Sequence, residues 1–237
     1  MVDLYSTRGH LEKHRRGCDV DKNQNRRGRQ CRPRASHLLE CFVATMKPII
    51  LEQVAEAGHV VFTRGKWNLN LIGVRKANRK ANQFDDEFHL IFKDDRNQWN
   101  DVSLACTTDP GLYWLHNPMR SAGTAILKAG QYRGAYEIGL HRGRYPALVQ
   151  RKPVKVFRDR NRNDVLDMDP NTEIEGLFGI NIHHAGFGDS HRVEKWSAGC
   201  TVIQSITAWE ILMSIVRKSA DLWGDRFTYT LLEEKNA

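Results

Sequence analysis

Short apolar runs separated by turn-forming residues occupy most of the chain between residues 59 and 157, and they limit the possible folds more than any other feature. The runs are rich in β-branched and aromatic residues, and Gly, Asn and Asp clusters lie between them. They are the segments 59–63, 68–75, 87–93, 99–108, 113–115, 124–127, 129–143 and 153–157, together with Val149. The pattern predicts a mainly β domain in which Gly134 permits a bend within one long strand.

Two helices are predicted on either side of this strand-rich region. Residues 47–58 have an amphipathic pattern with Ile50, Val54 and Ala57 on one face. Residues 207–221 give the clearest helix, with Thr207 as its N-cap. Its apolar face consists of Trp209, Leu212, Ile215 and Val216. A strand over residues 227–232 closes the chain, so the sequence predicts a β-rich α+β fold.

The net charge of +8 is concentrated near the N-terminus. Residues 1–45 contain ten Lys and Arg residues and five Asp and Glu residues, so they carry five of the eight excess positive charges. Their composition is polar and without apolar periodicity, which is typical of disorder. We expect residues 1–45 to form a basic, disordered extension and residues 46–237 to form one folded domain, with Met46 as an alternative start. Such an extension can bind nucleic acid or another anionic surface.

The cysteines and the apolar runs exclude several classes of protein. Five cysteines (residues 18, 31, 41, 106 and 200) include no CxxC pair, which argues against a zinc knuckle or a disulfide framework. No run approaches the roughly 20 apolar residues that a membrane span needs. The first 37 residues lack the apolar middle segment of a secretory signal. We therefore predict no membrane span, and no export signal is recognisable.

The residues with the clearest chemical potential gather between residues 178 and 204. His183, His184 and His191 precede Cys200, which ends the segment Ser197-Ala198-Gly199-Cys200. A thiol nucleophile needs a nearby base, and histidine is the side chain best suited to that role near neutral pH. A zinc site formed by the three histidines and Cys200 is the alternative. Against it, adjacent residues of a strand point to opposite faces and cannot easily bind one ion.

This arrangement resembles the signature of the L,D-transpeptidase (YkuD-like) family, in which Ile-His is followed by Ser/Thr-His-Gly-Cys. Here Ile182-His183 is separated by 13 residues from Ser197, and a predicted helix follows Cys200. The segment 128–132 resembles, more weakly, a turn that precedes the catalytic strands of the family. The resemblance extends over roughly residues 100–233. Ala198 departs from it, because the family has a histidine at this position.

The resemblance implies a β-sandwich or barrel with one helix after the catalytic cysteine, and residues 46–237 as the catalytic domain. Cys200 would attack an amide carbonyl with His183 as the base, which gives a thioester. Ser197 and Gly199 would shape a turn whose N–H groups bind the oxyanion, and His184 could support the base. The implied substrate is a peptidoglycan stem peptide, in the cell envelope or periplasm. We expect a monomer without cofactor or metal.

The second half of the reaction stays open at this point. Capture of the thioester by an amine is transpeptidation, whereas capture by water is carboxypeptidase or endopeptidase action. A non-enzymatic polyanion-binding protein is a further alternative, based on the basic extension.

Residues 158–170 resemble a calcium-binding loop, with candidate ligands Asp159, Asn161, Asn163 and Asp167. Asp164 stands where such a loop has glycine, and Pro170 stands where it has glutamate. We therefore predict a polar loop without calcium.

Overall fold

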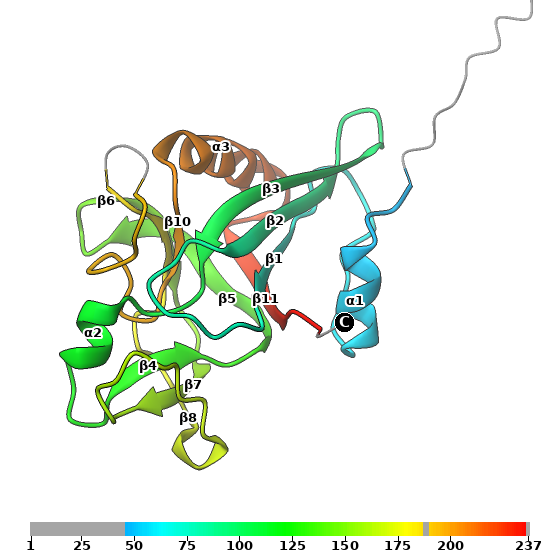
Figure 1. The fold of residues 1–237 in the computed structure, drawn as a ribbon. Helices are drawn as coiled ribbons and strands as arrows, with labels where there is room; N and C mark the ends of the chain where they lie inside the picture. Colours follow the sequence, from blue (N-terminus) through cyan, green and yellow to red (C-terminus); the bar gives the residue numbers. More distant parts are fainter. Residues whose placement is uncertain (1–45, 187–189, 236–237) are drawn as a thin grey trace, which may run out of the picture. The chain divides into compact units, whose positions relative to one another are not determined.

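The computed structural model describes residues 46–186 and 190–235, all within one compact unit, and the predicted extension at residues 1–45 lies outside this range. Strands predominate over helices, which confirms the mainly β fold (Figure 1). The strands are β1 (Asn70–Arg75), β2 (Asp86–Lys93), β3 (Trp99–Thr107), β4 (Thr124–Leu127), β5 (Gly130–His141), β6 (Tyr145–Gln150), β7 (Val154–Asp159), β8 (Ile174–Gly176), β9 (Ile182–His184), β10 (Thr201–Ile203) and β11 (Arg226–Glu233). The helices are α1 (Ile50–Glu56), α2 (Leu112–His116), α3 (Ile206–Trp223) and the 3₁₀ turn η1 (Pro170–Thr172).

Eight strands close into a barrel in the order β1-β11-β5-β6-β9-β10-β3-β2. The pairs β1–β11 and β9–β10 are parallel, and the other neighbours are antiparallel. Strand β5 bends where Gly134 has a φ of +54°, opposite a register shift between Phe227 and Tyr229 of β11. The glycine-permitted bend predicted from the sequence is therefore present, and it helps the strand curve around the barrel.

Strands β4, β7 and β8 form a second, three-stranded sheet in the order β4-β7-β8, seen below the barrel in Figure 1. Alternation along β4 divides its side chains between two clusters. Ala125 and Leu127 pack in the barrel core, whereas Ile126 packs with Leu115 of α2 and Phe157 of β7. The small sheet thus holds α2 and its following loop against one end of the barrel.

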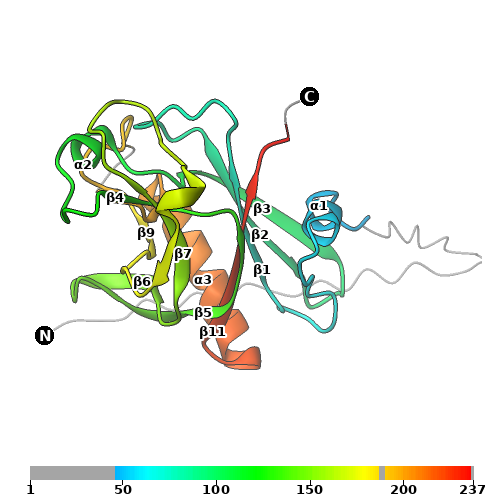
Figure 2. The same cartoon turned by 90° about the horizontal axis from the view of Figure 1, so that it is seen from below.

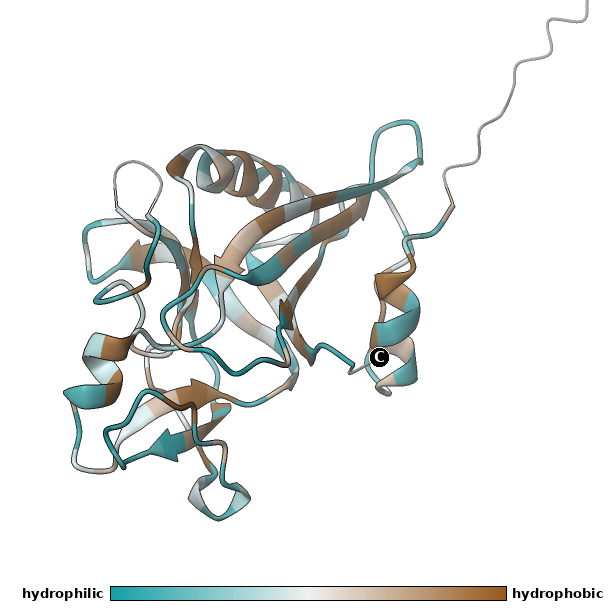
Figure 3. Ribbon diagram, in the orientation of Figure 1, coloured by the Kyte–Doolittle hydropathy of each residue, from teal (hydrophilic) through white to brown (hydrophobic). Residues whose placement is uncertain are grey.

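Helix α3 completes the barrel core with the apolar face that its sequence period produces. Trp209, Leu212, Met213 and Val216 are buried there, at the spacing of one helical face. Figure 2 shows α3 running past β5 and β11, and Figure 3 shows its hydrophobic residues in brown. The helix follows Cys200 as predicted, but its N-cap is Ser205 rather than Thr207. No helix in the described ranges is long and apolar enough to cross a membrane.

Three local predictions were wrong. Residues 59–63 are not a strand, because the Asn70 side chain binds both backbone groups of Phe62. The Asn70 amide oxygen accepts from the Phe62 N–H (2.8 Å), and its amide nitrogen donates to the Phe62 carbonyl (2.9 Å). Residues 113–115 belong to helix α2, which begins after Gly111. The predicted face of helix α1 is right only in part: Val54 is buried, but so is Leu51, whereas Ile50 is half-buried and Ala57 is exposed, and the helix is shorter than the predicted range.

Candidate active site

Strands β9 and β10 bring the two halves of the sequence signature together. They pair in parallel, with Ile182 opposite Thr201 and His183 opposite Val202. Because paired residues of adjacent strands point to the same face, His183 shares its face with Val202, and Cys200, which directly precedes β10, packs with Val202. The predicted base and the predicted nucleophile therefore lie on the same side of the β9–β10 pair.

The turn before Cys200 is held by the Ser197 hydroxyl. Its Oγ donates to the Cys200 carbonyl (2.7 Å) and accepts from the Gly199 N–H (3.1 Å). Gly199 has a φ of +116°, and a Cβ there would lie 2.3 Å from the carbonyl oxygen of Ala125. Only glycine fits this position, both conformationally and sterically. The Gly199 N–H, predicted as an oxyanion donor, is instead engaged by Ser197.

The Cys200 side chain is almost fully buried, with 7% of the residue exposed. Its Sγ accepts from the Asn181 N–H (3.4 Å) and donates to the Gly179 carbonyl (3.5 Å). Burial raises the pKa of the Cys200 thiol to about 11, although the Asn181 N–H and the charge of Arg142 oppose the rise. At neutral pH the sulfur is therefore a thiol, and a nucleophilic role would require a base.

His183 has the protonation state and the tautomer that such a base requires. Its Nδ1 lies 2.8 Å from the His184 carbonyl oxygen, which can only accept, so Nδ1 carries the proton and Nε2 carries the lone pair. Burial, followed by the neighbouring His141 ring, lowers the pKa of the His183 imidazole to about 3. Nε2 is buried without a hydrogen-bond partner among the described residues, Cys200 Sγ included.

The hairpin between β5 and β6 contributes groups that the sequence did not point to. The His141 ring stacks on His183 with centroids 4.0 Å apart, and its Nδ1 accepts from the Asn181 side-chain amide (3.1 Å). The Tyr145 hydroxyl lies 3.1 Å from His183 Nδ1. Burial, with Arg142 and His184, lowers the pKa of His141 to about 4, so this ring is also neutral. We call His141, Tyr145, Asn181, His183 and Cys200 the imidazole cluster.

The other histidines of the signature lie elsewhere. His184 points away from Cys200, where Nδ1 donates to the Ala185 carbonyl and the ring lies 4.5 Å from that of Tyr145. It lines a cleft of about 720 Å³ together with Trp196 and Trp209. His191 is exposed. In residues 46–186 and 190–235, no three His, Cys, Asp or Glu side chains are arranged to hold a metal ion, so the zinc arrangement is not supported there.

The loop at residues 158–170 engages several of its side-chain oxygens internally, although Asp159 Oδ1 is buried without a hydrogen-bond partner among the described residues. Asp159 accepts from the Asp167 N–H (3.1 Å), Asn161 accepts from the Asn163 N–H (3.2 Å), and Asn163 accepts from the Val165 N–H (2.8 Å). These are the short-range contacts of a polar turn. One oxygen each of Asp159, Asn161 and Asn163 is thus engaged by the loop's own backbone, and Asp167 accepts from the Asn161 side chain.

Comparison with known proteins identifies no relative of this chain. No family model matches the chain, and no curated protein and no solved structure is significantly similar to it.

Proposed function

We propose that this protein is a cysteine-dependent acyltransferase of the L,D-transpeptidase type, with peptidoglycan stem peptides as acyl donors. One observation carries the proposal. A neutral imidazole with a free, buried Nε2 lone pair lies on the same side of the β9–β10 pair as a buried, protonated thiol. An unpaired buried lone pair costs folding free energy, and His183 Nε2 differs from the other buried, unpartnered side-chain atoms of the described residues in lying on the side of the β9–β10 pair that carries a thiol.

In the proposed first step, His183 Nε2 removes the thiol proton as Cys200 Sγ bonds to the carbonyl carbon of a substrate amide. The carbonyl electron pair moves to oxygen. The Cys200 backbone N–H makes no hydrogen bond with any described residue, so it replaces Gly199 as the proposed oxyanion donor. Collapse breaks the C–N bond, and the protonated His183 gives its proton to the leaving amine, which leaves a thioester.

In the second step, an acceptor amine attacks the thioester carbonyl while His183 takes the amine proton, and the proton returns to Sγ as the thiolate leaves. The product is a new amide. If water replaces the amine, the product is an acid, which is the carboxypeptidase or endopeptidase alternative. In this scheme His141 supports the base through its stacking contact with His183. The chain has Ala198 at the position where the family has a histidine. No cofactor enters the scheme, and we expect the protein to act as a monomer.

The experiment is incubation of a disaccharide tetrapeptide with the wild-type protein and with the Cys200→Ala variant, followed by intact-mass measurement. We expect an acyl adduct on the wild type and none on the variant. Cys106→Ala is the matched control, because Cys106 is fully buried in the barrel core and should leave the adduct unchanged. Absence of adduct and product from both wild type and Cys200→Ala would overturn the proposal.

The product of the same incubation separates transfer from hydrolysis when an amine acceptor is added.

The polyanion-binding alternative rests on residues 1–45 and predicts nucleic-acid binding that falls steeply with salt. A protein beginning at Met46 should lose that binding and retain the acyl adduct, if both the extension and the active site act as proposed.

A further inference from the structure

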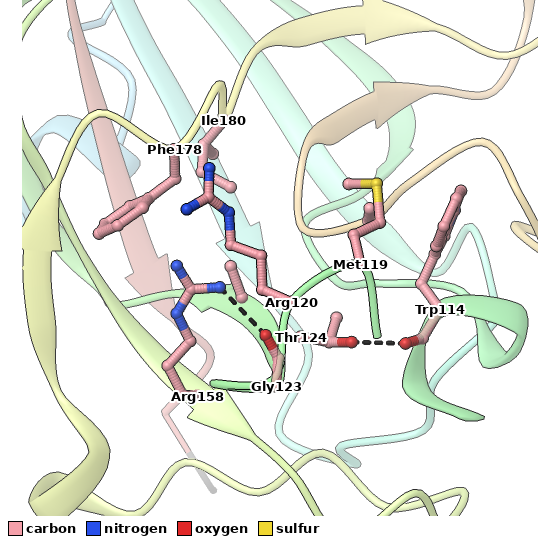
Figure 4. A pocket seen from close by; sticks show the side chains of 10 residues that line it. Trp114, Met119, Arg120, Gly123, Thr124, Arg158, Phe178 and Ile180 are labelled. Atoms are coloured by element: carbon pink, nitrogen blue, oxygen red, sulfur yellow. Dashed lines mark hydrogen bonds between the residues drawn. The ribbon is translucent and has the colours of Figure 1, made fainter. Parts of the chain in front are cut away.

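Two arginines share a pocket beside the turn that carries Cys200. Arg120 lies in the loop between α2 and β4, and Arg158 lies on β7, where it pairs with Ala125 of β4. The pocket has a volume of about 50 Å³, and its walls include Trp114, Met119, Phe178 and Ile180. Figure 4 shows the guanidinium groups of both arginines extending into the same space beside Phe178.

Arg158 is held in place but not neutralised. It is 9% exposed, its Nη1 donates to the Gly123 carbonyl (3.1 Å), and its guanidinium lies 4.7 Å from the centre of the Phe178 ring. Its Nε is buried without a hydrogen-bond partner in the described part of the chain. Burial lowers the pKa of Arg158, and the nearby charge of Arg120 lowers it further. Two like charges so placed favour an anion between them.

Nearby carboxylates do not fill this role. Within the described ranges, neither Arg120 nor Arg158 forms a salt bridge. Asp167 and Asp169 line a second pocket together with Arg158, and there Asn161 and Asn171 donate to their carboxylates. A planar guanidinium with free N–H groups matches a carboxylate in two parallel hydrogen bonds.

The pocket and the thiol share the same turn. Ala198 forms part of the pocket wall, two residues before Cys200, and Gly199 packs on the carbonyl of Ala125. When the amide carbonyl of a bound peptide lies at Cys200 Sγ, a peptide side chain next to that amide can therefore reach the pocket. The apolar walls suit the carbon chain of an amino acid more than a bare inorganic anion.

We propose that the Arg120–Arg158 pocket is a carboxylate-binding subsite that holds an acidic group of the peptide attacked by Cys200. The identity of the ligand rests on the proposed function, whereas the binding of a carboxylate does not. The subsite also gives a physical reason for an alanine at position 198, because a larger side chain there would enter the pocket.

The test measures binding to the Cys200→Ala protein, which cannot form the thioester. Calorimetry with the disaccharide tetrapeptide should show binding that Arg158→Gln and Arg120→Gln each weaken by roughly ten- to a hundredfold, the range for a lost charge-assisted hydrogen bond. Arg133→Gln, an exposed arginine on β5, is the matched control and should change the affinity less than about twofold. The peptide with its carboxylates converted to amides should bind weakly to every variant.

A second probe separates this inference from the proposed function. Glutarate should raise the midpoint of thermal unfolding of the wild-type protein, and either pocket variant should abolish that rise. Loss of the glutarate effect in Arg120→Gln, whose side chain is exposed, supports the subsite even if Arg158→Gln fails to fold. If the thioester forms but neither the tetrapeptide nor glutarate responds to the arginines, the subsite is wrong and the thiol chemistry stands. If glutarate binds through the arginines but no thioester forms, the subsite stands and the thiol chemistry is wrong.

Discussion

Two buried polar clusters in this protein differ in how their groups are satisfied. Around Arg75, which is 1% exposed, charges are paired: Nε lies 2.8 Å from Asp109 Oδ1, which makes this ion pair but no hydrogen bond with any described residue. Nη2 donates to the Thr108 carbonyl (3.1 Å), and Asp86 accepts from both the N–H and the hydroxyl of Thr108 at 2.7 Å. We call Arg75, Asp86, Thr108 and Asp109 the ion-pair cluster. The imidazole cluster contains neutral groups and leaves His183 Nε2 unused.

The difference indicates different tasks. Burial raises the pKa of both Asp86 and Asp109, the latter to about 7, and the charge of Arg75 opposes this rise. The ion-pair cluster fixes the chain after β3, where the Gly111 N–H donates to the Ser197 carbonyl (2.9 Å) and so supports the turn before Cys200. The imidazole cluster can change its protonation state without leaving a permanent charge unpaired. Substitutions should therefore affect stability in one cluster and chemistry in the other.

The largest expected effect is on the rate of acyl transfer when the base is removed. His183→Asn keeps a donor near the His184 carbonyl but deletes Nε2. We expect the rate of thioester formation to fall by roughly 10²- to 10⁴-fold, the usual contribution of a general base, while the free energy of unfolding changes by less than about 1 kcal/mol. Rapid-mixing mass spectrometry and urea unfolding measure the two quantities.

His191→Asn is the matched control for this substitution, because His191 is exposed and outside the cluster. It should change neither quantity. A His183→Asn protein that forms the thioester at the wild-type rate would remove His183 from the mechanism.

The second effect concerns the pH dependence of the thiol. Because the pKa of Cys200 is raised to about 11, its thiolate fraction should increase about tenfold per pH unit from pH 7 to pH 10. The rate of iodoacetamide alkylation, followed on the peptide that contains Cys200, should rise with the same slope. Glutathione, with an ordinary thiol pKa near 9, should level off earlier. A plateau for Cys200 above neutral pH would instead indicate a preformed thiolate–imidazolium pair.

The third effect tests the ion-pair cluster. Arg75→Met leaves two buried carboxylates without their cation, and we expect it to lower the free energy of unfolding by about 3–5 kcal/mol. Arg133→Met, on the exposed face of β5, should change it by less than about 0.5 kcal/mol. Urea unfolding monitored by tryptophan fluorescence compares the two. Equal stability of both variants would mean that the pairing around Arg75 contributes little.

The smallest expected effect is that of Tyr145→Phe. It removes a hydroxyl 3.1 Å from His183 Nδ1 while the His184 carbonyl still fixes the tautomer. We expect the rate of thioester formation to fall only about two- to tenfold, consistent with one neutral hydrogen bond. A loss as large as that for His183→Asn would show that Tyr145, rather than the His184 carbonyl, orients the base.

Some of this site could be predicted from the sequence because its signals are local. Gly199 was assigned to a tight turn, and its positive φ and close contact with Ala125 are the physical reason. The alternation of a strand correctly separated His183 from His184. The strand at 59–63 failed because Asn70, from outside the segment, binds the backbone of Phe62. Residues 113–115 failed because apolar and aromatic residues suit a buried helix as well as a strand.

The sequence by itself determined the mainly β architecture, the helix after the cysteine and the opposite directions of His183 and His184. These features follow from the period of the side chains and from the conformation of glycine, and both are set by residues close together in the sequence. Only the tertiary structure placed His141 on His183, and Arg120 with Arg158 beside Ala198. Barrel closure and strand register bring these groups together across long stretches of chain. Burial then sets their pKa values, and no local pattern carries that information.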